Sequence, residues 1–106
     1  MQLRQYLRFS VKVPVVFKGT NIAGEGAVYN ISAGGCMIEG NQEVEQGAVL
    51  ALSIRMADQE PPLMVAQASV QWVMRQKFGL KFLQLEEQEK ARLRQWIKSL
   101  EKTAQA

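Results

Sequence analysis

Apolar and polar residues alternate with a period of two through most of the first 83 residues. Between residues 9 and 18 every second residue is apolar, at Val11, Val13, Val15 and Phe17. This is the pattern of a β-strand with one buried face. Pro14 interrupts it on the polar side and has no backbone N–H, so we expect this strand to lie at an edge or to pair only partly there.

Five further segments are predicted to be strands, and turn residues separate them: 27–31, 36–38, 48–56, 63–75 and 78–82. Within them, alternation predicts that Val28 and Asn30 share a face with Ser32. It also predicts an inward face on each of three strands: Leu50, Leu52, Ile54 and Met56; then Met64, Ala66, Ala68, Val70 and Trp72; then Phe78, Leu80 and Phe82. Trp72 and Trp96 are interpreted as core anchors, with a stacking role for Trp72 as the less favoured alternative. Short strands with regular turns indicate an all-β barrel or sandwich.

The period becomes helical from Glu86 to Lys102. Leu93, Trp96, Ile97 and Leu100 follow the spacing i, i+3, i+4 and i+7, which places them on one stripe of a helix. We expect this stripe to pack on the strands, with a dimer contact as the alternative. No Ser, Thr, Asp or Asn is in place to cap the helix N-terminus, so its start is not well defined by the sequence.

Length and composition indicate one folded domain. The chain has 106 residues, of which 47% are hydrophobic and 22% charged. It contains neither an apolar run of the ~20 residues that a membrane span requires nor a signal-peptide pattern. Cys36 is the only cysteine, which suits a reducing compartment, and we interpret it as a small buried side chain. These features favour a cytoplasmic location.

Histidine is absent from the sequence. Without it, neither a Ser-His-Asp nor a Cys-His catalytic arrangement can form, and a single cysteine cannot complete a zinc site. Glu86, Glu87 and Glu89 gather in the helical segment, where a solvated surface is the simpler interpretation than an acid/base pair. We therefore expect no enzymatic activity and no metal or cofactor.

Positive charge is concentrated at the N-terminus. The net charge is +3, and the first 24 residues hold four cations and no acid: Arg4, Arg8, Lys12 and Lys18. Such a segment attracts anions, phosphate esters above all. The alternative is a basic edge that only keeps the molecule soluble.

One short motif lies within this basic segment, and a second follows soon after it. Arg4 and Arg8 are four residues apart, and Asn30, Ser32 and Gly35 follow in a polar turn. Taken singly, the arginines could be merely solvated, and the turn could satisfy its own backbone. Taken together, they resemble the paired signature R-x-x-x-R and [DN]-x-S-x-x-G of the PilZ domain family, without a departure at any signature position.

This resemblance implies a receptor for the second messenger cyclic di-GMP that has no catalytic activity. It also implies the fold: a six-stranded antiparallel split barrel with a C-terminal α-helix, mainly β. On this basis residues 1–106 form a single PilZ-like domain, with a flexible basic arm at 1–8, the barrel at 9–83 and the helix at 86–102. The implied ligand-binding residues are Arg4, Arg8, Asn30, Ser32 and Gly35.

The chemistry of these residues suits the implied ligand. Arginine bonds phosphate or guanine through its planar fork and stacks on bases. Asn30 can pair with a guanine edge, and Ser32 can donate to phosphate or accept from a base amine; which of the two meets base and which meets phosphate stays open. We expect the arm to close on the barrel around the ligand and to create a surface for a downstream protein. Leu3, before the first arginine, favours one bound ligand molecule by analogy with the family.

Two other functions remain open from the residues. One is a nucleic-acid-binding β-barrel, which the basic arm supports, although aromatic residues are not interleaved with the cations along the strands. The other is a degenerate PilZ-like module that acts only through protein contacts, against which the intact signature argues.

Overall fold

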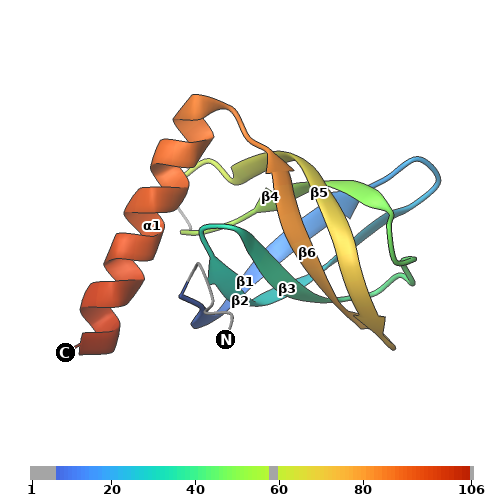
Figure 1. Ribbon diagram of the computed structural model, residues 1–106, viewed down its shortest axis with the longest axis horizontal. Coiled ribbons are helices and arrows are strands. Elements are labelled where there is room, and N and C mark those ends of the chain that lie inside the picture. Colours follow the sequence, from blue (N-terminus) through green and yellow to red (C-terminus); the bar gives the residue numbers. More distant parts are fainter. Residues whose placement is uncertain (1–6, 58–59, 106) are drawn as a thin grey trace, which may run out of the picture.

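Six antiparallel strands close into a barrel, and one helix follows them (Figure 1). The computed structural model describes residues 7–57 and 60–105, with side chains as far as residue 102. The strand order around the barrel is β1-β2-β3-β6-β5-β4, which confirms the predicted fold class. The elements are β1 (Phe9–Lys18), β2 (Ala23–Ser32), β3 (Gly35–Gly40), β4 (Val49–Ile54), β5 (Leu63–Met74), β6 (Lys77–Gln84) and α1 (Glu87–Gln105).

The core fills the inside of the barrel with the alternating apolar residues of its strands. Phe17 of β1 and Phe78 of β6 meet edge to face, with ring centroids 5.3 Å apart. The predicted inward positions of β1, β4 and β6 are confirmed, and these are among the buried residues: Val15, Phe17, Leu50, Leu52, Ile54, Phe78 and Leu80. Alternation therefore predicts burial correctly where the pairing is regular.

Pro14 limits the pairing of β1, as predicted. Strand β1 pairs with β4 only from Val15 to Lys18, and the carbonyl of Pro14 still accepts a hydrogen bond from the N–H of Arg55 at 3.0 Å. A closed barrel has no edge strand, so of the two predicted outcomes the partial pairing near Pro14 is the one observed.

The prediction for the first half of β5 is wrong. Leu63 and Val65 are buried in the core, whereas Met64 and Ala66 are exposed. The pairing register of β5 shifts near this point, between Gln67 and Ala68 against β6. Such a bulge adds one residue and reverses the faces of those that precede it; beyond it, the expected burial returns at Ala68 and Val70.

Trp72 is not the core anchor that the sequence predicted. A second register shift lies between Val70 and Trp72, and the Trp72 side chain is 41% exposed. A Cβ atom on Gly79 would approach Trp72 Nε1 to 2.1 Å, so the indole lies flat across this glycine. The aromatic ring thus covers the outside of the β5–β6 hairpin.

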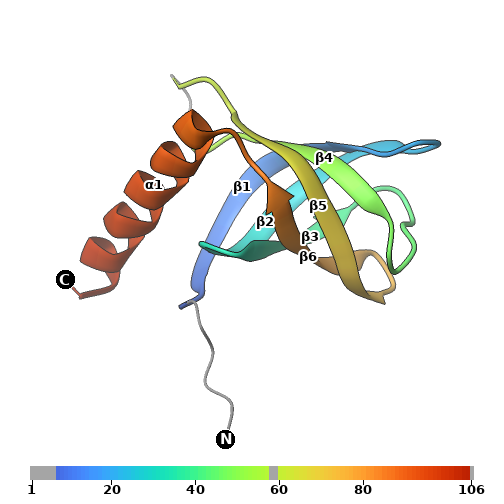
Figure 2. The ribbon, with the colours of Figure 1, turned by 45° about the horizontal axis from the view of Figure 1, so that its top comes forward.

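Helix α1 packs on one end of the barrel, which confirms that prediction. Leu93 is buried in the core, and the other three apolar residues of the stripe pack against it: Trp96, Ile97 and Leu100. The β2–β3 turn and the start of β1 lie at this same end (Figure 2). Among the described residues, no helix has the length and apolar character to cross a membrane.

Candidate functional site

The two predicted motifs meet on the outside of the barrel. Arg8 immediately precedes β1, and its Nη1 donates a hydrogen bond of 3.0 Å to Oδ1 of Asn30 on β2. The register explains this contact, because Phe9 pairs with Ile31 and Ser10 with Asn30. Arg4 lies outside the described residues.

Asn30 faces outward because of a bulge in β2. Val28 and Ile31 are both buried in the core although they are three residues apart, and the register against β3 shifts between Val28 and Asn30. The extra residue turns Asn30 to the outer face. The expectation that Val28 and Asn30 share a face is therefore wrong, and the asparagine lies where it can meet a ligand.

The Ser32 hydroxyl makes two hydrogen bonds inside the β2–β3 turn. This buried hydroxyl accepts a hydrogen bond from the Gly34 N–H at 3.2 Å and donates one to the Gly35 carbonyl at 3.3 Å. These contacts agree with the self-satisfied turn named above as the alternative. The hydroxyl keeps one lone pair for a further donor.

Gly35 is in close contact with β6. A Cβ atom at this position would lie 2.1 Å from the Leu80 carbonyl oxygen, far inside van der Waals contact. Among the described glycines only Gly47 has a positive φ, so the left-handed conformation is not the reason for glycine here. The absent side chain lets strands β3 and β6 approach each other beneath the turn.

Cys36 follows the turn and is buried, as predicted. Burial raises the pKa of its thiol from 9.0 to about 12, and the positive charge of Arg8 opposes this shift. A thiol with so high a pKa is protonated at neutral pH and is a poor nucleophile. It serves the core.

An exposed aromatic ring lies on the same row of the barrel as Asn30. The register runs from Asn30 to Met37, then Gly79, then Trp72 across four neighbouring strands. The indole covers Gly79 from outside. Sequence reasoning missed this placement of Trp72; the signal available was a glycine in the partner strand, which leaves room for a ring to lie flat.

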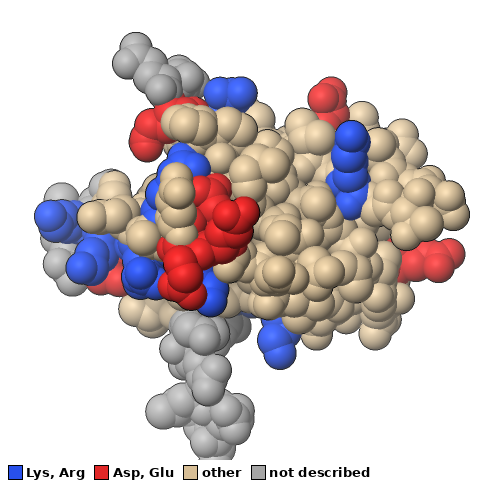
Figure 3. All heavy atoms as spheres, turned by 90° about the horizontal axis from the view of Figure 1, so that it is seen from above, with Lys and Arg blue, Asp and Glu red and all other residues tan. Residues whose placement is uncertain are grey.

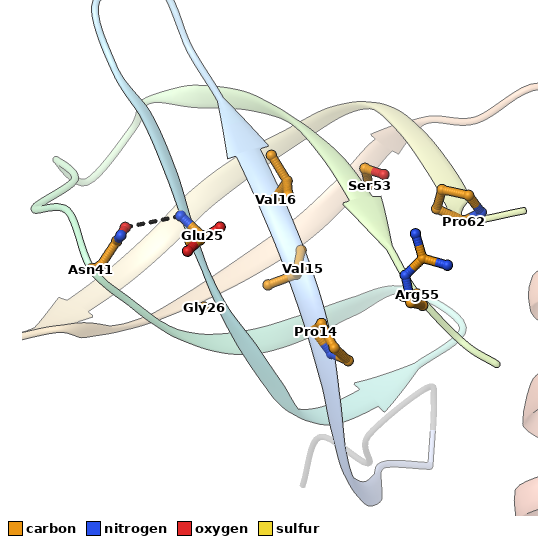
Figure 4. Close-up of a pocket in the computed structure, with 9 residues that line it drawn as sticks. All are labelled: Pro14, Val15, Val16, Glu25, Gly26, Asn41, Ser53, Arg55 and Pro62. Carbon is orange, nitrogen blue, oxygen red and sulfur yellow. Dashed lines mark hydrogen bonds between the residues drawn. The ribbon is translucent and has the colours of Figure 1, made fainter. Parts of the chain in front are cut away.

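A separate hollow of about 440 Å³ lies over β1, β2 and β4 (Figure 4). Glu25 and Arg55 lie on opposite sides of β1 there, and the N–H of Glu25 donates to Asn41 Oδ1 at 2.9 Å. The four predicted site residues that the structure describes do not line it: Arg8, Asn30, Ser32 and Gly35. Across residues 7–57 and 60–105, no group of three His, Cys, Asp or Glu could hold a metal ion.

Solved structures with the same fold come from several bacteria. The PilZ domain of YcgR from Escherichia coli, solved with c-di-GMP, is 20% identical over 97% of this chain and 95% of its own, with a TM-score of 0.79. The inhibitor of motility MotI/DgrA from Bacillus subtilis is 23% identical, with a TM-score of 0.73; 93% of this chain aligns with it but spans only 51% of its length. The PilZ domain of CeSA from a cellulose-synthesizing bacterium is 13% identical over 90% of this chain and 98% of its own, with a TM-score of 0.70.

At these sequence identities the solved structures establish only that the fold is shared. Comparison with curated proteins gave no match. The family model described as "PilZ domain" matches residues 2–99, nearly the whole chain and both motifs. This chain belongs to the PilZ domain family.

Proposed function

We propose that this domain is a non-enzymatic receptor for cyclic di-GMP. The ligand-binding residues of the proposal are Arg4, Arg8, Asn30, Ser32 and Gly35. The observation that carries it is the hydrogen bond from Arg8 to Asn30, which joins two motifs 22 residues apart. Membership of the PilZ family and the E. coli relative solved with c-di-GMP support the same ligand.

The exposed pair has the groups that this ligand needs. Arg8 uses one N–H on Asn30, and its other donors are available to a phosphodiester or to guanine O6 and N7. The Asn30 carbonyl accepts from Arg8, so its NH₂ group can donate to a guanine edge. Ser32 and Gly35 act through the turn: the hydroxyl holds it closed, and the glycine sets its distance from β6.

Binding in this proposal draws the N-terminal arm onto the barrel. Arg4 would add a second guanidinium beside Arg8, so that the ligand links the arm to the β2–β3 turn. The arm then presents a new surface to a downstream protein in the cytoplasm. The change is an ordering of one segment by charge-assisted hydrogen bonds, a common form of ligand switch.

The test is a calorimetric titration with cyclic di-GMP on the intact chain. Arg8→Ala, Arg4→Ala and Asn30→Ala should each weaken binding at least tenfold, since a hydrogen bond to a charged group contributes about 1.5–3 kcal/mol. Arg55→Ala is the matched control, because this exposed arginine lies in the hollow over β1. Melting temperatures should stay close to the unmutated value in the Arg8, Asn30 and Arg55 variants, since none of these three side chains is buried.

The same titration separates the alternatives. A nucleic-acid-binding barrel would take up polynucleotide with a steep dependence on salt and show no preference for guanine. A module that acts only through protein contacts would bind no nucleotide. Absence of cyclic di-GMP binding by the unmutated domain would refute the proposed function.

A further inference from the structure

A second hollow, of about 490 Å³, separates α1 from the β2–β3 turn. Ala33 and Gly34 of the turn form one side of it. Three cations line it: Lys81 from β6, and Lys90 and Arg94 from α1, with Leu93 among the apolar residues beneath them. The hollow therefore begins at the turn that carries the PilZ signature.

The charge in this hollow is not balanced. None of the described residues that line it is a carboxylate. Lys90 pairs with Glu87 at 3.4 Å, but the side chains of Lys81 and Arg94 have neither a hydrogen bond nor an ion pair among residues 7–57 and 60–105. The lining of the hollow over β1, by contrast, includes a carboxylate, Glu25, as well as Arg55. Figure 3 shows charged side chains gathering over α1, with the barrel surface beside it mostly uncharged.

The position of Lys81 relates the hollow to the proposed ligand site. The strands run in the order β1-β2-β3-β6, so Arg8, before β1, and Lys81, on β6, flank the β2–β3 hairpin from opposite sides. Lys81 pairs with Gly35. Three strand spacings of about 4.8 Å place the backbones of Arg8 and Lys81 roughly 14 Å apart. Both side chains are long, so their charged ends can lie closer together than their backbones.

A cyclic dinucleotide carries two phosphodiesters. Suppose that one phosphodiester binds Arg8 and that the ligand rests on the end of the β2–β3 hairpin. The other phosphodiester then faces β6. An anion held there by two cations over an apolar floor is partly shielded from water, which strengthens the attraction. Lysine acts as a point charge and arginine as a planar fork, so the pair tolerates a range of phosphate orientations.

We propose that Lys81 and Arg94 form a second phosphate-binding subsite, which holds the phosphodiester of cyclic di-GMP that Arg8 does not. This inference rests on the proposed function. It adds to the signature one residue from β6 and one from α1, and it makes the position of α1 part of the binding site. Lys90, already paired with Glu87, contributes charge but no obligatory contact.

The experiment titrates cyclic di-GMP into the intact domain and four charge-removing variants. Lys81→Gln and Arg94→Gln should each weaken binding about tenfold, the effect of losing a charge-assisted contact at a partly exposed site. Lys77→Gln, on the same strand as Lys81, and Lys98→Gln, one turn along α1 from Arg94, are the matched controls. They remove the same charge outside the hollow and should leave affinity within twofold. Thermal unfolding confirms that each variant is folded.

Salt provides a second measurement. Raising KCl from 50 to 300 mM should weaken binding to the unmutated domain more than binding to Lys81→Gln, because one ionic contact has already been lost. If Arg8→Ala abolishes binding while Lys81→Gln and Arg94→Gln match their controls, the second subsite is refuted and the receptor function stands. If the unmutated domain binds no cyclic di-GMP, both proposals fail.

Discussion

At the scale of single residues, the described positions of the PilZ signature differ in their structural roles. Arg8 and Asn30 are outward and joined to each other. Ser32 is buried and bonded to its own turn, and Gly35 is buried against β6. Substitutions at the first pair should therefore affect ligand binding, whereas those at the second pair should also affect folding.

Gly35→Ala is predicted to destabilise the domain by about 1–3 kcal/mol, the usual cost of forcing extra volume into a packed site. The added Cβ would meet the backbone oxygen of Leu80 at 2.1 Å, and backbone cannot move aside cheaply. Urea unfolding measures the change.

Gly79→Ala is the matched control for this prediction. The Cβ added there also meets an atom at 2.1 Å, but that atom belongs to the Trp72 side chain, which is 41% exposed and can swing into solvent. Its free energy of unfolding should fall by less than that of Gly35→Ala. Equal stability of Gly35→Ala and the unmutated domain would contradict the prediction.

At the scale of elements, α1 is fastened to the barrel by polar contacts as well as by Leu93. Glu89 Oε1 accepts a hydrogen bond from the Met64 N–H at 2.6 Å and pairs with Arg92 Nη1 at 3.2 Å. Arg92 also donates to the carbonyls of Pro61 and Pro62. The helix is thereby joined to the segment that leads into β5.

Glu89→Ala is predicted to lower the free energy of unfolding by about 1–3 kcal/mol, because it leaves the Met64 N–H without its acceptor and Arg92 without its carboxylate partner. Its side chain is only 12% exposed. Glu87→Ala is the control: this side chain is 86% exposed, its one ion pair within the described part of the chain is with Lys90, and such exposed pairs contribute little. Chemical denaturation of both variants provides the test, and equal effects would contradict the assigned role of Glu89.

At the scale of the whole molecule, one end of the barrel gathers the elements that the proposals need. The start of β1, the β2–β3 turn and α1 all lie there (Figure 2), and the hollow that Lys81 and Arg94 line opens between the last two. A ligand bound at this end would contact the arm, the barrel and the helix together. The proposals assign no role to the opposite end, where the β5–β6 hairpin turns at Arg75 and Gln76.

Hydrogen exchange measures this closure. Saturating cyclic di-GMP should slow amide exchange in residues 1–10 and 30–35, since the ligand would link the arm to the turn. Residues 63–74 of β5 serve as the internal reference and should change little. Unchanged protection throughout residues 1–35 would rule out ordering of the arm.

The sequence alone was enough for the fold class, the helix and the family. Alternation in β1, β4 and β6 depends on neighbouring residues, as does the stripe of Leu93 and Trp96, and local patterns can be read without knowing what packs against them. The signature could be found because its spacing lies within two short segments.

Tertiary structure alone decided which face several residues take and which of them meet. Asn30 turns outward and Met64 becomes exposed because bulges shift the register, and a bulge belongs to a pair of strands, not to one. Lys81 and Arg94 are neighbours across a hollow only because β6 and α1 pack against the same turn. Such contacts depend on the pairing and packing of distant segments, which no local period encodes.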